Sequence, residues 1–235
     1  MGGGGDPGPR RGVVEYVDHR LARMRSRGVL ITFEGVEGSG KSTQARRLAD
    51  ALEAKGLGVC LTGEPDGTPL GAAVRAMLET DGAHRTPLAE SFLFMAARQQ
   101  HVAQVVRSAL ERGDVVISDR YVDATVAYQG YARGLDIRTI EELNLVATGG
   151  VLPDLTLVLD LPAEVGMARI AGRAHDSFER LGLDFHTRVR QGYLEIAAAH
   201  KARVMLISAD RPEDEVELAV WRAVEERFGE TLRGA

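Results

Sequence analysis

One stretch of the chain has the residue types and spacing of a phosphate-binding loop. From Gly35 to Ser42 the sequence fits G-x-x-x-x-G-K-S, after a short apolar run and before a helix-forming segment. Backbone N–H groups of such a turn can point at phosphate oxygens, and the following helix adds its positive end. The Lys41 ammonium can neutralise β- and γ-phosphate charge, and the Ser42 hydroxyl can bind Mg²⁺. The predicted contacts of the nucleotide phosphates are Gly35, Gly38, Ser39, Gly40, Lys41, Ser42 and Thr43.

A charged group follows a second apolar run, V-V-I-S. Asp119 and Arg120 come directly after it, with Tyr121 next. An aspartate at a strand end beside a phosphate loop can hold Mg²⁺, directly or through water. An arginine there can bind a phosphate or stabilise the charge of a phosphoryl group in transfer. The alternative is a surface ion pair with no role in chemistry.

Phe94 and Arg98 lie four residues apart in a helix-forming segment, so they share one face of a helix. An aromatic ring beside a guanidinium suits a planar heterocycle, which stacks on the ring and accepts hydrogen bonds at a carbonyl. Without its context the pair has an equally good alternative, because an aromatic at helical spacing is often a core residue.

Short apolar runs alternate with amphipathic segments, and these are the elements that must position the polar groups. Strands are predicted at Val29–Phe33, Gly58–Thr62, Val115–Ser118, Leu155–Asp160 and Val204–Ser208. Helices are predicted at Ser42–Lys55, through Val74, Met77 and Leu78, and at Leu88–Arg112, Ala124–Tyr131, Ile137–Ala147, Ala163–Ala171, Phe185–Lys201 and Glu213–Arg227.

This alternation predicts β-α-β units and an α/β fold with a central five-stranded parallel sheet flanked by helices. Ligands of such sheets bind beyond the carboxyl ends of the strands. The first three strands are followed by E-G-V-E-G-S-G-K, by G-E-P-D-G-T and by D-R-Y. Their polar groups therefore collect at one edge of the sheet.

Composition limits the class of protein. The 235 residues suit one domain, and the net charge of −5 gives no basic excess of the kind that nucleic-acid binding shows. The single cysteine, Cys60, cannot form an intrachain disulfide, and no apolar run reaches membrane-spanning length. The N-terminus lacks the apolar core of a signal peptide. We expect a cytoplasmic enzyme that binds small phosphorylated molecules and neither nucleic acid nor membrane.

Several stretches together resemble the thymidylate kinases of the bacterial type, which phosphorylate dTMP to dTDP with ATP. The stretches are F-E-G-V-E-G-S-G-K-S-T, E-P-x-G-T at Glu64–Thr68, F-M-A-A-R at Phe94–Arg98, the block that starts with D-R-Y at Asp119–Gly134, P-D-L-T-L-V-L-D at Pro153–Asp160, and F-H-T-R-V-R-Q-G-Y-L at Phe185–Leu194. The resemblance implies a P-loop kinase fold, Mg²⁺ and a homodimer. It covers residues 28–229 as one nucleoside monophosphate kinase domain and leaves residues 1–27 as an N-terminal extension, partly disordered.

The resemblance also implies roles at matching positions. Those for dTMP are Glu37 as acceptor of the sugar 3′-OH, Phe94 stacked on thymine, Arg98 as donor to a thymine carbonyl, Thr125 and Gln129 at the polar edge of the base, Tyr128 under the sugar, Arg75 and Arg120 on the monophosphate, and Glu64 near the acceptor and its metal-bound waters. The catalytic residues would be Lys41, Arg120, Arg173 and Glu37, and the metal ligands Ser42 and Asp119.

The family supplies a catalytic arginine either from the phosphate loop or from a short lid. Position 38 is glycine, so we expect the lid, at about residues 172–180, to supply it, with Arg173 as the reaching residue. Arg169 and Arg180 are the alternatives.

Three positions depart from the family pattern, each by removing positive or adding negative charge. Gly63 stands for an arginine and Asp66 for a glycine in R-E-P-G-G-T, and Ser177 stands for the arginine of D-R-F-E. Two alternatives to a dTMP kinase therefore stay open. One is a kinase for another or modified pyrimidine deoxynucleoside monophosphate, and the other is a nucleotide-binding homologue with weak catalysis.

Overall fold

The computed structural model describes residues 28–80, 85–172 and 178–229, which contain one five-stranded parallel sheet. The strands are β1 (Val29–Glu34), β2 (Val59–Gly63), β3 (Val115–Asp119), β4 (Leu155–Asp160) and β5 (Val204–Ser208). Their order is β2-β3-β1-β4-β5, and every neighbouring pair is parallel. The predicted α/β fold class and the five predicted strands are confirmed, with strand ends that differ by one residue at most.

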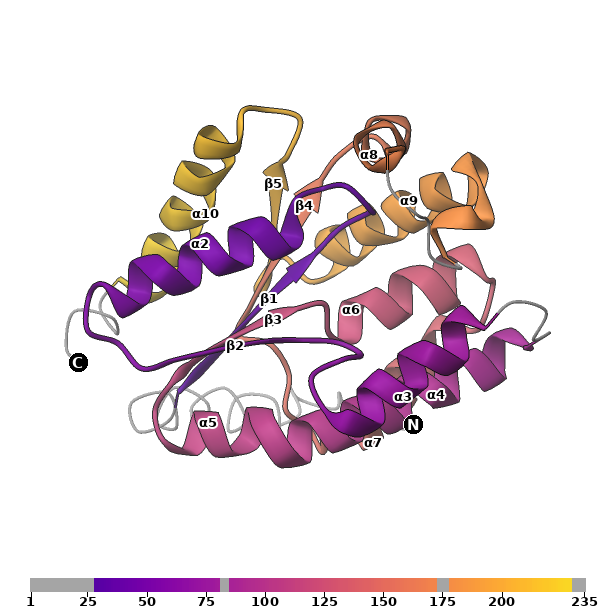
Figure 1. Ribbon diagram of the computed structural model, residues 1–235, viewed down its shortest axis with the longest axis horizontal. Helices are drawn as coiled ribbons and strands as arrows, with labels where there is room; N and C mark the ends of the chain where they lie inside the picture. Colours follow the sequence, from indigo (N-terminus) through magenta and orange to yellow (C-terminus); the bar gives the residue numbers. More distant parts are fainter. Residues whose placement is uncertain (1–27, 81–84, 173–177, 230–235) are drawn as a thin grey trace, which may run out of the picture.

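Helices cover both faces of the sheet, which explains why the strands are continuous apolar runs. Figure 1 shows α2 and α10 along one face and α5 toward the opposite one. The helices are α2 (Lys41–Glu53), α3 (Pro69–Glu79), α4 (Pro87–His101), α5 (Arg107–Glu111), α6 (Val122–Thr125), α7 (Ile137–Thr148), α8 (Ala163–Ile170), α9 (Leu183–Ala199) and α10 (Glu213–Phe228). Short π- and 3₁₀-helical turns are η1 (Val102–Val106), η2 (Val126–Ala132) and η3 (Glu179–Leu181).

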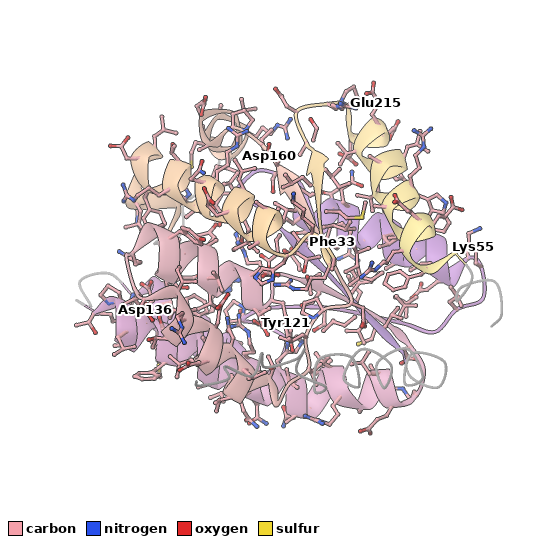
Figure 2. All side chains as sticks on the ribbon, turned by 180° about the vertical axis from the view of Figure 1, so that it is seen from behind. Phe33, Lys55, Tyr121, Asp136, Asp160 and Glu215 are labelled. Atoms are coloured by element: carbon pink, nitrogen blue, oxygen red, sulfur yellow. The ribbon has the colours of Figure 1, made fainter. Side chains whose placement is uncertain are left out.

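The core follows the alternation of side chains along the strands. Ile31 and Phe33 pack in one cluster with Leu48 and Leu52 of α2, while Leu30 packs in another with residues of η1 and α5. Figure 2 shows Phe33 and Tyr121 inside the fold and Asp136 and Lys55 on its outside. All five residues of these two clusters named above are at most 3 % exposed. The sheet therefore forms a rigid base for the residues that follow each strand.

Register brings the ends of β1, β2 and β3 together. Phe33 of β1 and Gly63 of β2 are both aligned with Asp119 of β3. Two backbone hydrogen bonds continue the pairing beyond the strands, from Arg120 N to Phe33 O at 2.9 Å and from Glu64 N to Asp119 O at 3.0 Å. The three polar segments therefore meet at one edge of the sheet, as predicted.

Parts of the predicted organisation lie outside the described residues. These are the N-terminal extension, residues 1–27, and the lid residues 173–177, which include Arg173 and Ser177. Within the described ranges, no helix is long and apolar enough to cross a bilayer.

Candidate active site

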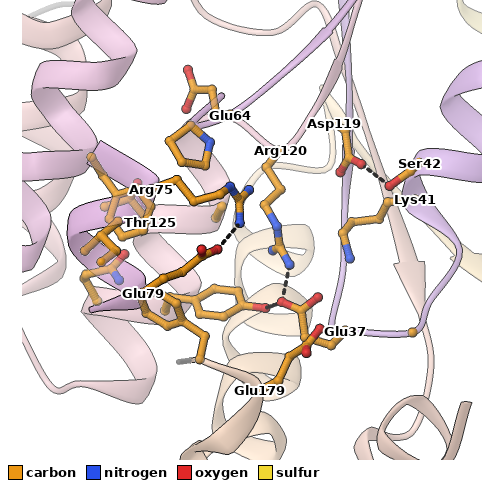
Figure 3. Close-up of a pocket in the computed structure, with 18 of the residues that line it drawn as sticks. Glu37, Lys41, Ser42, Glu64, Arg75, Glu79, Asp119, Arg120, Thr125 and Glu179 are labelled. Carbon is orange, nitrogen blue, oxygen red and sulfur yellow. Dashed lines mark hydrogen bonds and ion pairs between the residues drawn. The ribbon is translucent and has the colours of Figure 1, made fainter. Parts of the chain in front are cut away.

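A cavity of about 380 Å³ lies at the carboxyl edge of the sheet. Figure 3 shows side chains that line it, from the phosphate loop on one side to α3 and α4 on the other. The predicted site residues in its lining are Glu37, Gly38, Gly40, Lys41, Ser42, Thr43, Glu64, Arg75, Phe94, Arg98, Asp119, Arg120, Thr125, Tyr128 and Gln129. Gly35 and Ser39 are not part of that lining, and Arg173 lies outside the described residues.

The phosphate loop has the backbone that its glycines permit. Gly38 has φ +71°, and a Cβ atom there would lie 2.3 Å from the carbonyl oxygen of Gly166. A side chain at position 38 is therefore excluded twice, by backbone strain and by space. Gly40, with φ +89°, precedes the first residue of α2, so the free N–H groups of that helix face the cavity end of the loop.

Lys41 is held inside the loop. Its Nζ donates to the Val36 carbonyl at 2.8 Å and lies 3.4 Å from Ser39 Oγ. The side chain is only 6 % exposed, and burial lowers its pKa, with nearby Arg120 adding to the effect. The ammonium group is thus held against the loop by the Val36 carbonyl, where it can neutralise the charge of a phosphate chain.

The two predicted metal ligands touch each other. Ser42 Oγ donates a short hydrogen bond to Asp119 Oδ2 (Figure 3). A hydroxyl and a carboxylate oxygen are the donor types that Mg²⁺ prefers. The pair therefore fits the predicted ion, although no group of three or more His, Cys, Asp or Glu side chains gathers as a metal site in the described part of the chain.

Glu37, Arg120 and Tyr128 form one cluster between the loop and η2 (Figure 3). Glu37 Oε1 accepts a short hydrogen bond from Arg120 Nη2 and one of 3.0 Å from Tyr128 Oη. The Arg120 guanidinium also lies 5.0 Å from the centre of the Tyr128 ring. Burial alone would raise the pKa of Glu37, but Arg120 and Lys41 outweigh it and lower that pKa to about 2. Glu37 is therefore an ionised acceptor at neutral pH.

Arg120 adopts a backbone conformation that is uncommon for a residue with a side chain. Its φ is +68°, in the left-handed region. The strand ends hold it there, because Phe33 O accepts from its N–H and Ser118 Oγ donates to its carbonyl oxygen at 2.7 Å. Strained residues of this kind are typical of functional sites.

Arg98 is buried at 1 % exposure, and its nitrogens contact protein oxygens. Nε and Nη2 lie 2.9 and 2.7 Å from Glu64 Oε2, and Nη1 donates to Thr125 Oγ1 at 2.8 Å. Burial alone would raise the pKa of Glu64, but Arg98 and His101 outweigh it and lower that pKa. The described contacts thus give Arg98 the task of fixing Glu64, and its contact with a thymine carbonyl stays a prediction.

Aromatic rings form one wall of the cavity. The Phe94 ring lies 5.9 Å from that of Phe178, which in turn lies 6.1 Å from Tyr128, between ring centres. Gln129 also lines the cavity, and its side-chain amide donates a hydrogen bond of 2.9 Å to Glu90. A planar base can stack on the cavity side of such a wall, with amide and hydroxyl groups at its edge.

Several lining residues were missed by sequence reasoning: Pro65, Leu78, Glu79, Ala124, Ile170, Phe178 and Glu179. His101 was missed as well, although it contacts Glu64 directly, with Nδ1 and Oε1 3.2 Å apart. The available signal was helical spacing, since His101 follows Arg98 by one turn and Glu79 follows Arg75 by one turn.

The three departures from the family pattern differ in what the structure shows of them. A Cβ atom at Gly63 would lie 3.0 Å from the Asp119 carbonyl oxygen, so this glycine packs closely against the predicted metal ligand. Asp66 forms an ion pair with Arg75, with its Oδ2 2.5 Å from Nε. Ser177 lies outside the described residues.

Of the alternative lid arginines, Arg169 lies against the phosphate loop. Its Nη1 donates to the Gly38 carbonyl at 3.4 Å and its Nη2 to the Ala209 carbonyl at 3.2 Å. It therefore contacts the loop through one backbone oxygen, that of Gly38.

Comparison with known proteins gives a consistent result. The family model described as "Thymidylate kinase" matches residues 33–220. The chain is 46 % identical to the thymidylate kinase of Deinococcus radiodurans over 203 residues, covering 86 % of this chain and 98 % of that protein. It is 50 % identical to that of Solidesulfovibrio magneticus over 205 residues, covering 83 % and 98 %. The crystal structure of thymidylate kinase from Ehrlichia chaffeensis superimposes with a TM-score of 0.70 at 34 % identity, covering 84 % of this chain and 98 % of that one.

Proposed function

The chain belongs to the thymidylate kinase family, and from that membership we infer that it is an ATP-dependent nucleoside monophosphate kinase that phosphorylates dTMP to dTDP. The observation that supports this activity in the structure is a single cavity lined by both the phosphate loop and the Phe94–Arg98 helix face. A donor and an acceptor bound in one cavity can react in line without a covalent intermediate.

We propose that ATP binds at the loop end of this cavity. The phosphate chain contacts the loop and the start of α2, where Lys41 supplies positive charge and the helix supplies free N–H groups. The proposed contacts are Gly35, Gly38, Ser39, Gly40, Lys41, Ser42 and Thr43.

We propose that dTMP binds at the other end. Phe94 stacks on thymine, Thr125 and Gln129 meet its polar edge, and Tyr128 lies under the sugar. Tyr128 is buried and donates a hydrogen bond to Glu37. In the proposed binding mode its ring fills the space where a ribose 2′-OH would have to fit. This accounts for selection of a deoxyribose by shape.

The charges that line the cavity bear directly on how phosphoryl transfer is catalysed. The acceptor is already a phosphate oxyanion, so positioning and charge neutralisation dominate over acid–base catalysis. The cavity lining holds four cationic side chains, Lys41, Arg75, Arg98 and Arg120, against five carboxylates, Glu37, Glu64, Glu79, Asp119 and Glu179. The described residues therefore leave negative charge in excess before two polyanionic substrates bind.

We propose that Mg²⁺ and one lid arginine supply the missing positive charge. Mg²⁺ bound by Ser42 and Asp119 would screen the phosphate oxygens of ATP during transfer. Arg173 is the proposed lid residue. We further propose that the protein is a homodimer and that it is cytoplasmic. Family resemblance supports both proposals, and the single cysteine supports the cytoplasmic location.

The test of function is a coupled assay of ADP release at saturating ATP and dTMP. Wild-type turnover should exceed that of Lys41→Ala by orders of magnitude, because the loop lysine neutralises the transferred phosphate. Equal turnover of the two proteins would instead favour a nucleotide-binding protein without catalysis.

A further inference from the structure

Asp66 and Arg75 form an ion pair at the edge of the cavity. Asp66 lies in the loop between β2 and α3, and Arg75 lies on α3 with its guanidinium in the cavity lining (Figure 3). Oδ2 and Nε are 2.5 Å apart, and the side chains are 49 % and 38 % exposed. Glu79, one turn further along α3, lies 3.5 Å from Nη1 of the same arginine. Two carboxylates therefore face one guanidinium.

The backbone fixes this arrangement. Thr68 Oγ1 accepts from Gly71 N at 3.1 Å and caps the start of α3. A Cβ atom at Gly71 would lie 1.7 Å from the Pro65 carbonyl oxygen, so the loop packs directly on the helix. Asp66 is thus carried by a loop that is held against the helix of Arg75.

A carboxylate and a phosphate compete for the same guanidinium. Both are oxyanions that accept charge-assisted hydrogen bonds from arginine. A half-exposed ion pair contributes little to stability, so a phosphate dianion can displace Asp66. The displaced carboxylate stays close on its short loop, where it repels that dianion.

We propose that Asp66 sets the affinity of the chain for the acceptor phosphate, because its carboxylate occupies Arg75 and has to release it when the nucleoside monophosphate binds. The proposal rests on the proposed function, in which Arg75 binds the monophosphate of dTMP. It assigns to Asp66 a specificity-determining role that acts on the phosphate alone and leaves recognition of base and sugar unchanged.

The test compares a ligand with the phosphate and one without it. Calorimetric binding of dTMP and of thymidine is measured for the wild type, for Asp66→Asn, which keeps the size of the side chain, and for Asp66→Gly. Both variants should bind dTMP roughly three- to tenfold more tightly, since an exposed pair and a nearby like charge have effects of this order. Their affinity for thymidine should stay within about twofold of the wild type.

Two controls separate the possible causes. Asp50→Asn removes one negative charge from an exposed position on α2 outside the cavity lining and should change neither affinity. Arg75→Ala should weaken dTMP binding and leave thymidine binding unchanged. Unchanged or weaker dTMP binding in both Asp66 variants would overturn the proposal and make Asp66 a support for Arg75. An Arg75→Ala protein that binds dTMP normally would overturn it too, while turnover of dTMP by the wild type would still uphold the kinase function.

Discussion

At the scale of single residues, Glu37 connects the two ends of the cavity. It belongs to the phosphate loop, yet its acceptor oxygen receives Arg120 from the end of β3 and Tyr128 from η2. The low pKa, about 2, keeps it ionised through the neutral range. A movement of the phosphate loop would therefore also displace Arg120 and Tyr128, which are proposed to hold the acceptor.

Glu34 is a buried carboxyl with a structural task. It is completely buried at the end of β1, and its Oε1 accepts from Tyr121 N at 2.8 Å and Ala124 N at 3.2 Å. Tyr193 Oη lies 2.8 Å from Oε2. Burial raises the pKa of Glu34 from 4.5 to about 8, with Asp123 adding to the rise. In the folded state, this carboxyl keeps a proton that the unfolded chain releases.

This shift predicts how stability depends on pH. Between pH 4.5 and about 8 the folded state holds more protons at Glu34 than the unfolded state, so this group's contribution is full below pH 4.5 and declines as pH rises to about 8. Urea unfolding should be measured at about pH 5 and about pH 8.5. The free energy of unfolding should fall more between these two pH values for the wild type than for Glu34→Gln, which cannot ionise. The same loss in both proteins would show that other groups cause it.

At the scale of elements, the strands could be predicted closely and the contacts between helices could not. Buried parallel strands are continuous apolar runs, so β4 and β5 were placed with the right ends. The phosphate loop was also predictable, because its chemistry depends on neighbouring residues and backbone angles. The π-helical turns η1 and η2 have no composition of their own and were predicted only as helix.

Contacts across elements depend on packing that no local pattern encodes. Asp66 was recognised as a departure, but its pairing with Arg75 depends on how the loop after β2 lies on α3. The predicted donor Arg98 contacts Glu64, Thr125 and Asn144 from three different segments. Such partners become visible only once the segments are assembled.

His101 lies on α4 and contacts Glu64, which is a proposed substrate contact. It is completely buried in the last turn of α4, with Nε2 2.8 Å from Thr62 Oγ1 and Nδ1 3.2 Å from Glu64 Oε1. Replacement of His101 by phenylalanine removes both contacts and leaves Glu64 with one hydrogen-bond partner fewer.

We predict that His101→Phe lowers kcat/KM for dTMP roughly tenfold to a hundredfold, because a lost hydrogen bond to a buried charged group has an effect of that order. Steady-state kinetics below the melting temperature of the variant measure this. His200→Phe, at a half-buried histidine beyond the end of α9 and outside the cavity lining, is the control and should retain wild-type kinetics. Equal effects of the two changes would contradict a positioning role.

The lid arginine has its own prediction. Arg173→Ala should lower kcat roughly a thousandfold with little change in the KM for dTMP, since an arginine that meets the transferred phosphoryl acts in the transition state. Arg180→Ala, in the described part of the lid, is the matched comparison. If kcat holds and only the KM for dTMP rises, Arg173 is not the catalytic lid residue.

At the level of the whole molecule, α4 packs against both α3 and α7 (Figure 1), and the surface of these three helices carries exposed apolar side chains. Met77, Phe92, Leu145 and Val146 on it are each more than half exposed. Exposed apolar side chains that form a contiguous patch are typical of an interface, so the surface of these helices is a candidate for one.

We predict a homodimer through this surface. Light scattering after size exclusion should give twice the chain mass of 25.4 kDa, and Val146→Glu should shift the protein toward the monomer, since a charge in an apolar interface is costly. Asp50→Asn is the control. A wild-type monomer at high micromolar concentration would rule the dimer out.

Selection of dTMP as the phosphoryl acceptor is tested by measuring kcat/KM for dTMP, dUMP, TMP with a ribose, and base-modified pyrimidine deoxynucleoside monophosphates, each with ATP. We expect the highest value for dTMP and a loss of at least roughly a hundredfold for the ribose form, because Tyr128 is proposed to fill the space of a 2′-OH. A higher kcat/KM for another pyrimidine monophosphate would contradict this expectation.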